Sequence, residues 1–283
     1  HTDSSAASDV YKRQGYIFNT NNSPFNSTAE FENLKEEDYN STFSFMEEEN
    51  NRSIRFMELI DEYEKLSYED FKEIKYDQQY PDSILYIGNI SQIFDLDKSE
   101  FPNYENLIDL IQNWDRRGDI ENIGAAQWSL YYSYMLDVLS ENDLNVKDTI
   151  DIKFHLDALE KTKARLMNNF GKLDIRLGDI QRLVRGDKSL PVSGLIDMIA
   201  PTYSVPMEGG KVRAVSGESY IMLIKYSEDG PEVETVLPYG NSSNPSSPHY
   251  TDQMKMYTEK KLKIMTLDKD EILSRAARIY SPN

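Results

Sequence analysis

The chain has 283 residues, of which 39% are hydrophobic and 11% aromatic, so it can bury a sizeable core and is not a disordered tail. Its 49 acidic and 31 basic residues give a formal charge of −18, which opposes binding to phosphate backbones or anionic lipid. The absence of cysteine excludes disulfides and thiolate chemistry, and no apolar run reaches the roughly 20 residues that span a bilayer. We therefore expect partners other than nucleic acid or membrane.

The first fourteen residues show neither apolar periodicity nor a signal-peptide core. Residues 5–14 look like a translated sequencing adaptor joined to a truncated gene, although the composition also fits a disordered N-terminal arm. We expect residues 1–14 to be non-native and treat residues 15–283 as one domain.

Residues 15–24, Gly-Tyr-Ile-Phe-Asn-Thr-Asn-Asn-Ser-Pro, are rich in residues that favour a sharp turn. The turn carries two adjacent side-chain amides, Asn21 and Asn22, and such an amide can direct a fixed dipole at a reacting oxygen. A turn built only for its own geometry is the alternative. The acidic, Asn-rich stretch that follows, residues 26–51, is typical of a solvated loop.

Apolar residues at helical spacing predict a mostly helical region over residues 50–170. The first amphipathic helix spans residues 51–66, and Ser67 with Asp70 forms a predicted capping box for the next. The pattern predicts further helices at residues 107–114, 124–139 and 152–170.

The pattern changes to strands in residues 205–240. Strands are predicted at residues 212–215, 219–226 and 232–237, and the turn at 228–231 joins the last two into a β-hairpin. Helices followed by strands predict an α+β fold.

Three ordered motifs carry a resemblance to one family. The segment from Gly15 to Pro24 resembles the part of the penicillin acylase family that contains its oxyanion-hole asparagine, which corresponds to Asn21. Residues 185–192 and 239–253 are similar to two later blocks of that family. Among relatives, the motifs look most like the acyl-homoserine-lactone and aculeacin A acylases, and the resemblance covers residues 15–283, strongly at the ends and weakly between.

This resemblance implies an N-terminal nucleophile hydrolase with a four-layer αββα core, of which the chain would be the C-terminal part of the large chain. It implies an amide hydrolase that removes an acyl chain from an amine-bearing head group. Its nucleophile, an N-terminal Ser, would lie outside this chain, so we expect the fragment alone to be inactive. The alternative is a non-catalytic binding protein that retains the acylase scaffold.

The resemblance also implies partners and a location. The partners would be the missing N-terminal part of the large chain, the small chain of the same precursor and a small-molecule amide substrate. The expected location is the periplasm or the exterior of the cell.

Two residues are the candidate catalytic set. Asn21 would donate a hydrogen bond to the oxyanion of the tetrahedral intermediate. By resemblance, Arg55 at the start of the following helix would support Asn21. Because the acidic insertion before this helix is longer than in the penicillin G enzymes, Arg52 is a competitor, and a guanidinium on a solvated helix face is the structural alternative for Arg55.

The resemblance implies no cofactor for the chemistry. Relatives of the penicillin G type bind a structural calcium ion, whose ligands would lie largely outside this chain. Glu30, Glu32 or Asp38 could contribute a ligand, and the sequence does not choose among them.

Overall fold

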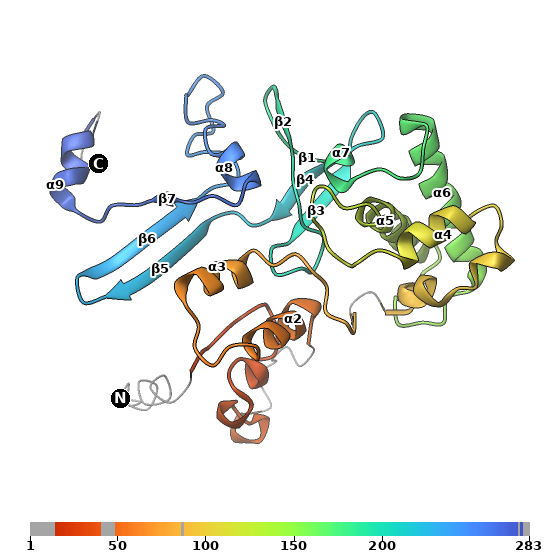
Figure 1. Ribbon diagram of the computed structural model, residues 1–283, viewed down its shortest axis with the longest axis horizontal. Coiled ribbons are helices and arrows are strands. Elements are labelled where there is room, and N and C mark those ends of the chain that lie inside the picture. The colour runs from red at the N-terminus through yellow and green to blue at the C-terminus, as the bar shows by residue number, and fades with distance from the viewer. Residues whose placement is uncertain (1–14, 41–48, 86–87, 277, 280–283) are drawn as a thin grey trace.

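The computed structural model describes residues 15–40, 49–85, 88–276 and 278–279 (Figure 1). It contains 38% helix and 17% strand, so the predicted α+β class is confirmed. The helices within residues 105–170 gather at one end, the hairpin at residues 221–236 extends from the other, and the strands within residues 181–217 lie between them (Figure 1). Residues 1–14 lie outside the described residues, and their foreign origin stays a prediction.

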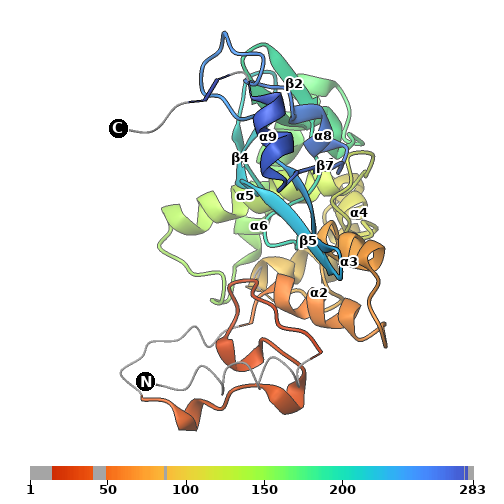
Figure 2. The same ribbon diagram turned by 90° about the vertical axis from the view of Figure 1, so that its left-hand side faces the viewer.

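The N-terminal region contains short 3-10 helices where a plain loop was expected, namely η1 (Pro24–Asn26), η2 (Glu30–Glu32) and η3 (Glu36–Asp38). It packs beneath α2 (Asn51–Ile60), on the side of the molecule away from α8 and α9 (Figure 2). The rings of Phe18 and Phe56 stack with centroids 4.3 Å apart, which attaches the first turn of the chain to this helix.

Helix α2 ends at Ile60 rather than at the expected residue 66. The backbone N–H groups of Glu62 and Tyr63 bond to carbonyls three residues back, which tightens the chain and ends the helix. The next helix is α3 (Tyr68–Lys75), and the predicted capping box of Ser67 and Asp70 is confirmed.

The main hydrophobic core lies among the central helices. These are η4 (Gly88–Asp95), η5 (Lys98–Glu100), α4 (Glu105–Gln112), α5 (Ala125–Glu141), α6 (Ile152–Phe170) and α7 (Leu177–Ile180). Trp128 and Met135 on α5 and Leu159 on α6 are at most 1% exposed. The periodic apolar positions therefore correctly predicted α4, α5 and α6.

Two sheets follow. Strands β1 (Gln181–Arg185), β2 (Lys188–Pro191), β3 (Thr202–Pro206) and β4 (Val212–Gly217) form one sheet in the order β2-β1-β4-β3. Strands β5 (Ile221–Ser227), β6 (Gly230–Val236) and β7 (Lys263–Ile264) form the other, and the predicted hairpin is its antiparallel β5–β6 pair. Two short helices, α8 (Met254–Thr258) and α9 (Lys269–Arg275), complete the described chain.

The strand-rich part begins at Gln181, earlier than the expected residue 205. In β1 only Gln181 and Leu183 are buried, and β2 has no buried residue. Strands this short, with so few apolar inward positions, carry too little alternation to be recognised from the sequence.

Gly124 fixes the start of α5 and should resist substitution. It has φ +104°, and a Cβ there would lie 2.6 Å from the Cβ of Trp114. Gly124→Ala combines backbone strain with a clash against the core, so we expect a loss of about 2–4 kcal/mol of unfolding free energy in urea titrations.

The matched control is Gly171→Ala, because Gly171 has φ +72° but no atom within 4 Å of the added Cβ. Strain alone should cost about 1–2 kcal/mol there. Equal losses in the two variants would contradict the role given to the Trp114 contact.

His155 gives the fold a calculable pH dependence. Its ring is 1% exposed, Nδ1 lies 2.5 Å from the hydroxyl of Tyr131, and Nε2 lies 3.2 Å from Oε1 of Gln92. An amide oxygen only accepts, so Nε2 carries the proton and Nδ1 accepts from Tyr131. Burial lowers the pKa of His155 from 6.5 to about 4.

The folded state therefore keeps His155 neutral while the unfolded chain takes up a proton below pH 6.5. Its contribution to stability is complete above the unfolded pKa and declines as pH falls towards the folded value, by about 3 kcal/mol at most. Urea titrations between about pH 7 and pH 4 should show this decline in the wild type. His155→Gln should lack this part of the decline, and parallel curves for the two proteins would refute it.

Candidate active site

Asn21 presents its side-chain NH₂ group on the exposed face of the first loop. Its backbone is left-handed, with φ 63°, and its backbone N–H donates to Oδ1 of Asn19 at 2.7 Å. The side-chain Oδ1 accepts a hydrogen bond from Nη1 of Arg52 at 3.0 Å. Nδ2 of Asn21 has no hydrogen-bond partner among the residues that the structure describes. The guanidinium thus orients the amide and leaves its two N–H donors available.

The side chain of the neighbouring Asn22 makes hydrogen bonds within the loop. It is 7% exposed, its Oδ1 accepts from the backbone and hydroxyl of Thr20 at 2.9 and 3.0 Å, and its Nδ2 donates to the carbonyl of Asn26 at 2.5 Å. Both ends of this side chain hold the loop together. Asn22 therefore has no donor to spare for a ligand.

Arg52 is held between two partners. Its Nε donates to Oδ1 of Asp197 at 2.9 Å while Nη1 faces Asn21. The other carboxylate oxygen of Asp197 accepts from the backbone N–H of Asn51 at 3.0 Å. One carboxylate thereby fixes both the guanidinium and the first turn of α2, and it balances the charge of Arg52.

The structure does not bring Arg55 to Asn21. Arg55 instead makes two hydrogen bonds to Asp77, each 3.1 Å long, and a third to Glu58 at 3.1 Å. The expected contact between Arg55 and Asn21 is therefore wrong, and the competitor Arg52 makes it. The physical reason is that Asp77 and Asp197 hold the two guanidinium groups in different places.

A pocket of about 580 Å³ opens beside this cluster. Asn21, Asn51, Arg52 and Asp197 supply its polar wall, and its aromatic wall includes Tyr132. Burial, with a smaller effect of Asp197, raises the pKa of Tyr132 to about 12, so its hydroxyl stays neutral at physiological pH.

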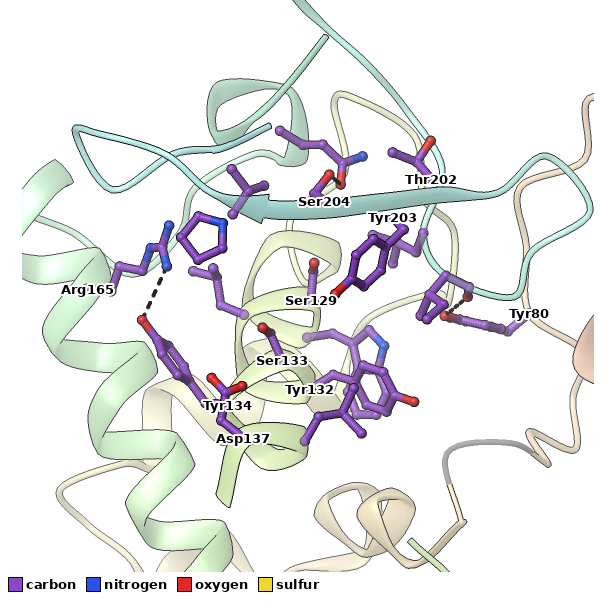
Figure 3. A pocket seen from close by; sticks show the side chains of 18 residues that line it. Tyr80, Ser129, Tyr132, Ser133, Tyr134, Asp137, Arg165, Thr202, Tyr203 and Ser204 are labelled. Atoms are coloured by element: carbon purple, nitrogen blue, oxygen red, sulfur yellow. Dashed lines mark hydrogen bonds between the residues drawn. The ribbon is translucent and has the colours of Figure 1, made fainter. Parts of the chain in front are cut away.

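Figure 3 shows a second cavity, of about 130 Å³. The two share Tyr80, Tyr132, Ile196 and Tyr203 as lining residues. In Figure 3, Tyr203 reaches from β3 towards α5, which carries Tyr132. The remaining wall of this second cavity combines apolar side chains, among them Trp128, Leu130 and Val212, with polar and charged ones, among them Asp137, Arg165 and Gln181. The pocket at Asn21 therefore lies beside a cavity whose wall is partly apolar and partly polar.

The contribution of Glu30, Glu32 or Asp38 to a calcium site stays a prediction. Glu32 and Asp38 are described, whereas the side chain of Glu30 is not. Within residues 15–40, 49–85, 88–276 and 278–279, no three acidic, histidine or cysteine side chains cluster in a way that could hold a metal. No described helix is both long and apolar enough to cross a membrane.

A family model described as penicillin amidase matches residues 3–274. The chain belongs to the penicillin amidase family. Family membership confirms the predicted resemblance.

Curated relatives of this family member are acylases. It is 31% identical over 102 residues to the acyl-homoserine lactone acylase PvdQ of Pseudomonas fluorescens Pf-5, covering 35% of this chain and 13% of the relative. It is 25% identical over 180 residues to PvdQ of Pseudomonas syringae pv. tomato, covering 57% and 23%. It is 29% identical over 94 residues to the aculeacin-A acylase of Actinoplanes utahensis, covering 30% and 11%. The chain thus spans less than a quarter of the length of these relatives.

Among solved structures, the chain is similar to the thermostable penicillin G acylase from Alcaligenes faecalis. The match has a TM-score of 0.42 and 12% sequence identity, and it covers 89% of this chain and 55% of that chain.

The two later family motifs contact each other in this penicillin amidase family member. Arg185, from the block at 185–192, lies over the rings of Tyr239 and Tyr250, from the block at 239–253, at 4.9 and 4.3 Å. Its Nη2 also donates to the carbonyl of Ser242 at 3.0 Å. Cation–π contacts of this kind fasten a long loop to the β1–β2 hairpin, which indicates a structural role for both motifs.

Proposed function

We propose that this chain supplies the oxyanion-stabilising side of an amide hydrolase that removes an acyl chain from an amine-bearing head group. The observation that carries the proposal is the arrangement of Asn21, whose oxygen is bound by Arg52 and whose NH₂ group is free beside the pocket. Family membership and the acylase relatives support the same class of reaction.

Attack on an amide carbonyl places negative charge on the carbonyl oxygen, and a fixed N–H donor stabilises that charge without reorganising. In our proposal the Nδ2 group of Asn21 is this donor. Arg52 withdraws electron density from the amide oxygen of Asn21, which makes its N–H groups better donors, and Asp197 keeps the guanidinium in place. An N-terminal Ser outside this chain supplies the nucleophile, with its own amine as base.

The proposed substrates are amides with a long acyl group, such as an acyl-homoserine lactone or a lipopeptide, as the names and class of the relatives suggest. In our proposal part of the acyl chain enters the cavity that adjoins the Asn21 pocket, where the apolar side chains of Trp128, Leu130 and Val212 form part of the wall.

Partners and location are further parts of the proposal. The N-terminal part of the large chain and the small chain of the same precursor complete the site, and the enzyme works in the periplasm or outside the cell. A structural calcium ion would be held mainly by residues of those other parts.

The proposal is tested by expressing the protein from the complete reading frame that encodes this chain. We expect the release of free amine from N-octanoyl-homoserine lactone, measured by a fluorogenic amine reagent. The 283-residue chain alone should release none. Saturable binding of the amide by the complete protein, without release of amine, would refute hydrolysis and favour a binding protein on the acylase scaffold.

A further inference from the structure

Asn51, the first residue of α2, has an amide whose orientation is fixed. The side chain is 1% exposed, and its Oδ1 accepts from the backbone N–H of Leu85 at 2.7 Å. Only the oxygen of an amide can accept from an N–H group, so the NH₂ group of Asn51 must occupy the other position. Nδ2 of Asn51 has no hydrogen-bond partner in the part of the chain that the structure describes.

A buried donor without a partner lowers stability, because it has lost water and gained no other acceptor. Such groups are rare in native proteins and call for an explanation. A ligand that supplies the missing acceptor is one explanation, and the position of Asn51 in the wall of the Asn21 pocket supports it.

The side-chain hydrogen bonds of Asn51 can be compared with those of the other asparagines near this pocket. Asn22 and Asn50 use both ends of their side chains within the protein, since Asn50 accepts from the N–H of Ser53 and donates to a backbone carbonyl. Asn21 and Asn51 use only their oxygens. Asn21 and Asn51 both line the same pocket, in which Asn21 is an exposed residue and Nδ2 of Asn51 is buried in the wall.

The charges around this pair indicate which acceptor fits. The guanidinium of Arg52 is already paired with the carboxylate of Asp197, so the wall has donors but little net charge. Such a wall suits a neutral carbonyl or ring oxygen better than a carboxylate or a phosphate, which would face Asp197 unpaired.

We propose that Asn51 is a specificity-determining residue that donates a hydrogen bond to a neutral acceptor oxygen in the head group of the amide bound at Asn21. The proposal rests on the proposed function for its reaction. It assigns the polar wall around Asn21 and Asn51 to the head group, and the adjoining cavity, where Trp128, Leu130 and Val212 offer apolar contacts, to the acyl chain.

The test compares two amides that differ only in the head group. N-octanoyl-homoserine lactone has a carbonyl and a ring oxygen in its five-membered ring, whereas N-octanoyl-cyclopentylamine has neither. The complete enzyme should prefer the lactone. Asn51→Asp keeps an oxygen for Leu85 but loses the donor, and it should raise KM for the lactone on the order of tenfold with little change in kcat. Its kcat/KM for the cyclopentyl amide should fall by much less, so that the preference for the lactone is largely lost.

The control variant is Asn145→Asp, which makes the same change in charge at an exposed loop asparagine whose Oδ1 accepts from the backbone N–H of Lys147 at 3.0 Å. It should keep the preference for the lactone. Equal losses on both substrates in Asn51→Asp, or a wild type without any preference, would overturn the proposal.

A binding measurement separates this proposal from the proposed function and does not depend on a variant that folds. In ¹⁵N-labelled wild-type protein, N-acetyl-homoserine lactone should shift the side-chain NH₂ resonances of Asn51, and N-cyclopentylacetamide should not. This result supports recognition by Asn51 even if neither octanoyl amide is hydrolysed. Identical shifts with both probes, or no shift with either, would refute it.

Discussion

Replacing Asn21 with glycine is expected to lower kcat by about 10²–10³-fold, which is the effect of removing one oxyanion donor. Glycine is the informative substitution because Asn21 has φ 63°, a conformation that glycine adopts without strain and alanine does not. Since the donor acts on the charge of the transition state, KM should change little. Steady-state hydrolysis of N-octanoyl-homoserine lactone by the complete enzyme measures both constants.

Two further variants test whether the loss of kcat comes from the missing hydrogen-bond donor or from a destabilised loop. Asn21→Asp keeps the shape of the side chain but replaces the donor with a second acceptor, so its activity should be at least as low as that of Asn21→Gly. Asn22→Ala removes bonds that hold the loop to itself, so it should lower the melting temperature, which Asn21→Gly should leave nearly unchanged. Undiminished turnover in Asn21→Gly would remove Asn21 from the mechanism.

The two arginines of α2 should separate activity from stability. Arg52→Ala removes the donor that orients the amide of Asn21, and we expect kcat to fall about 10- to 100-fold, equivalent to a charge-assisted hydrogen bond of about 1.5–3 kcal/mol. Arg55→Ala should retain most of the activity of the folded enzyme. It should instead lower the unfolding free energy by about 2–3 kcal/mol, because it leaves the carboxylate of Asp77 without its counterion.

The measurements are kcat at saturating amide and the midpoint of urea unfolding, both on the two single variants. Arg55 and Asp77 have side-chain exposures of 16% and 10%, so their ion pair is shielded enough for its loss to be measurable. Asp77→Asn is the matched variant, since it weakens the same ion pair from the other side and should reproduce the loss of stability. A larger loss of kcat in Arg55→Ala than in Arg52→Ala would instead support Arg55, which the family resemblance implied, as the arginine that assists Asn21.

Much of the fold follows from local patterns. The apolar positions of α5 and α6 recur every three or four residues, and burial of one helix face requires that spacing, so both helices were predicted with nearly their observed bounds. The β5–β6 hairpin was equally accessible because its strands are adjacent and its turn is rich in polar residues and glycine. Strands β1, β2 and β3 were missed because few of their side chains face the core.

Sequence by itself determined the family, because the family motifs are short runs of neighbouring residues. It could not choose Arg52 over Arg55, since that choice depends on which carboxylate lies beside each guanidinium. Arg52 and Asp197 are 145 positions apart, and no local signal marks Asp197 among 49 acidic residues. The role of the Asn51 side chain likewise cannot be predicted from the sequence. Only the folded chain brings the backbone N–H of Leu85 to Oδ1 of Asn51, which fixes the position of the NH₂ group. Local spacing decides secondary structure, whereas hydrogen-bond partners are decided by segments that meet only in the folded chain.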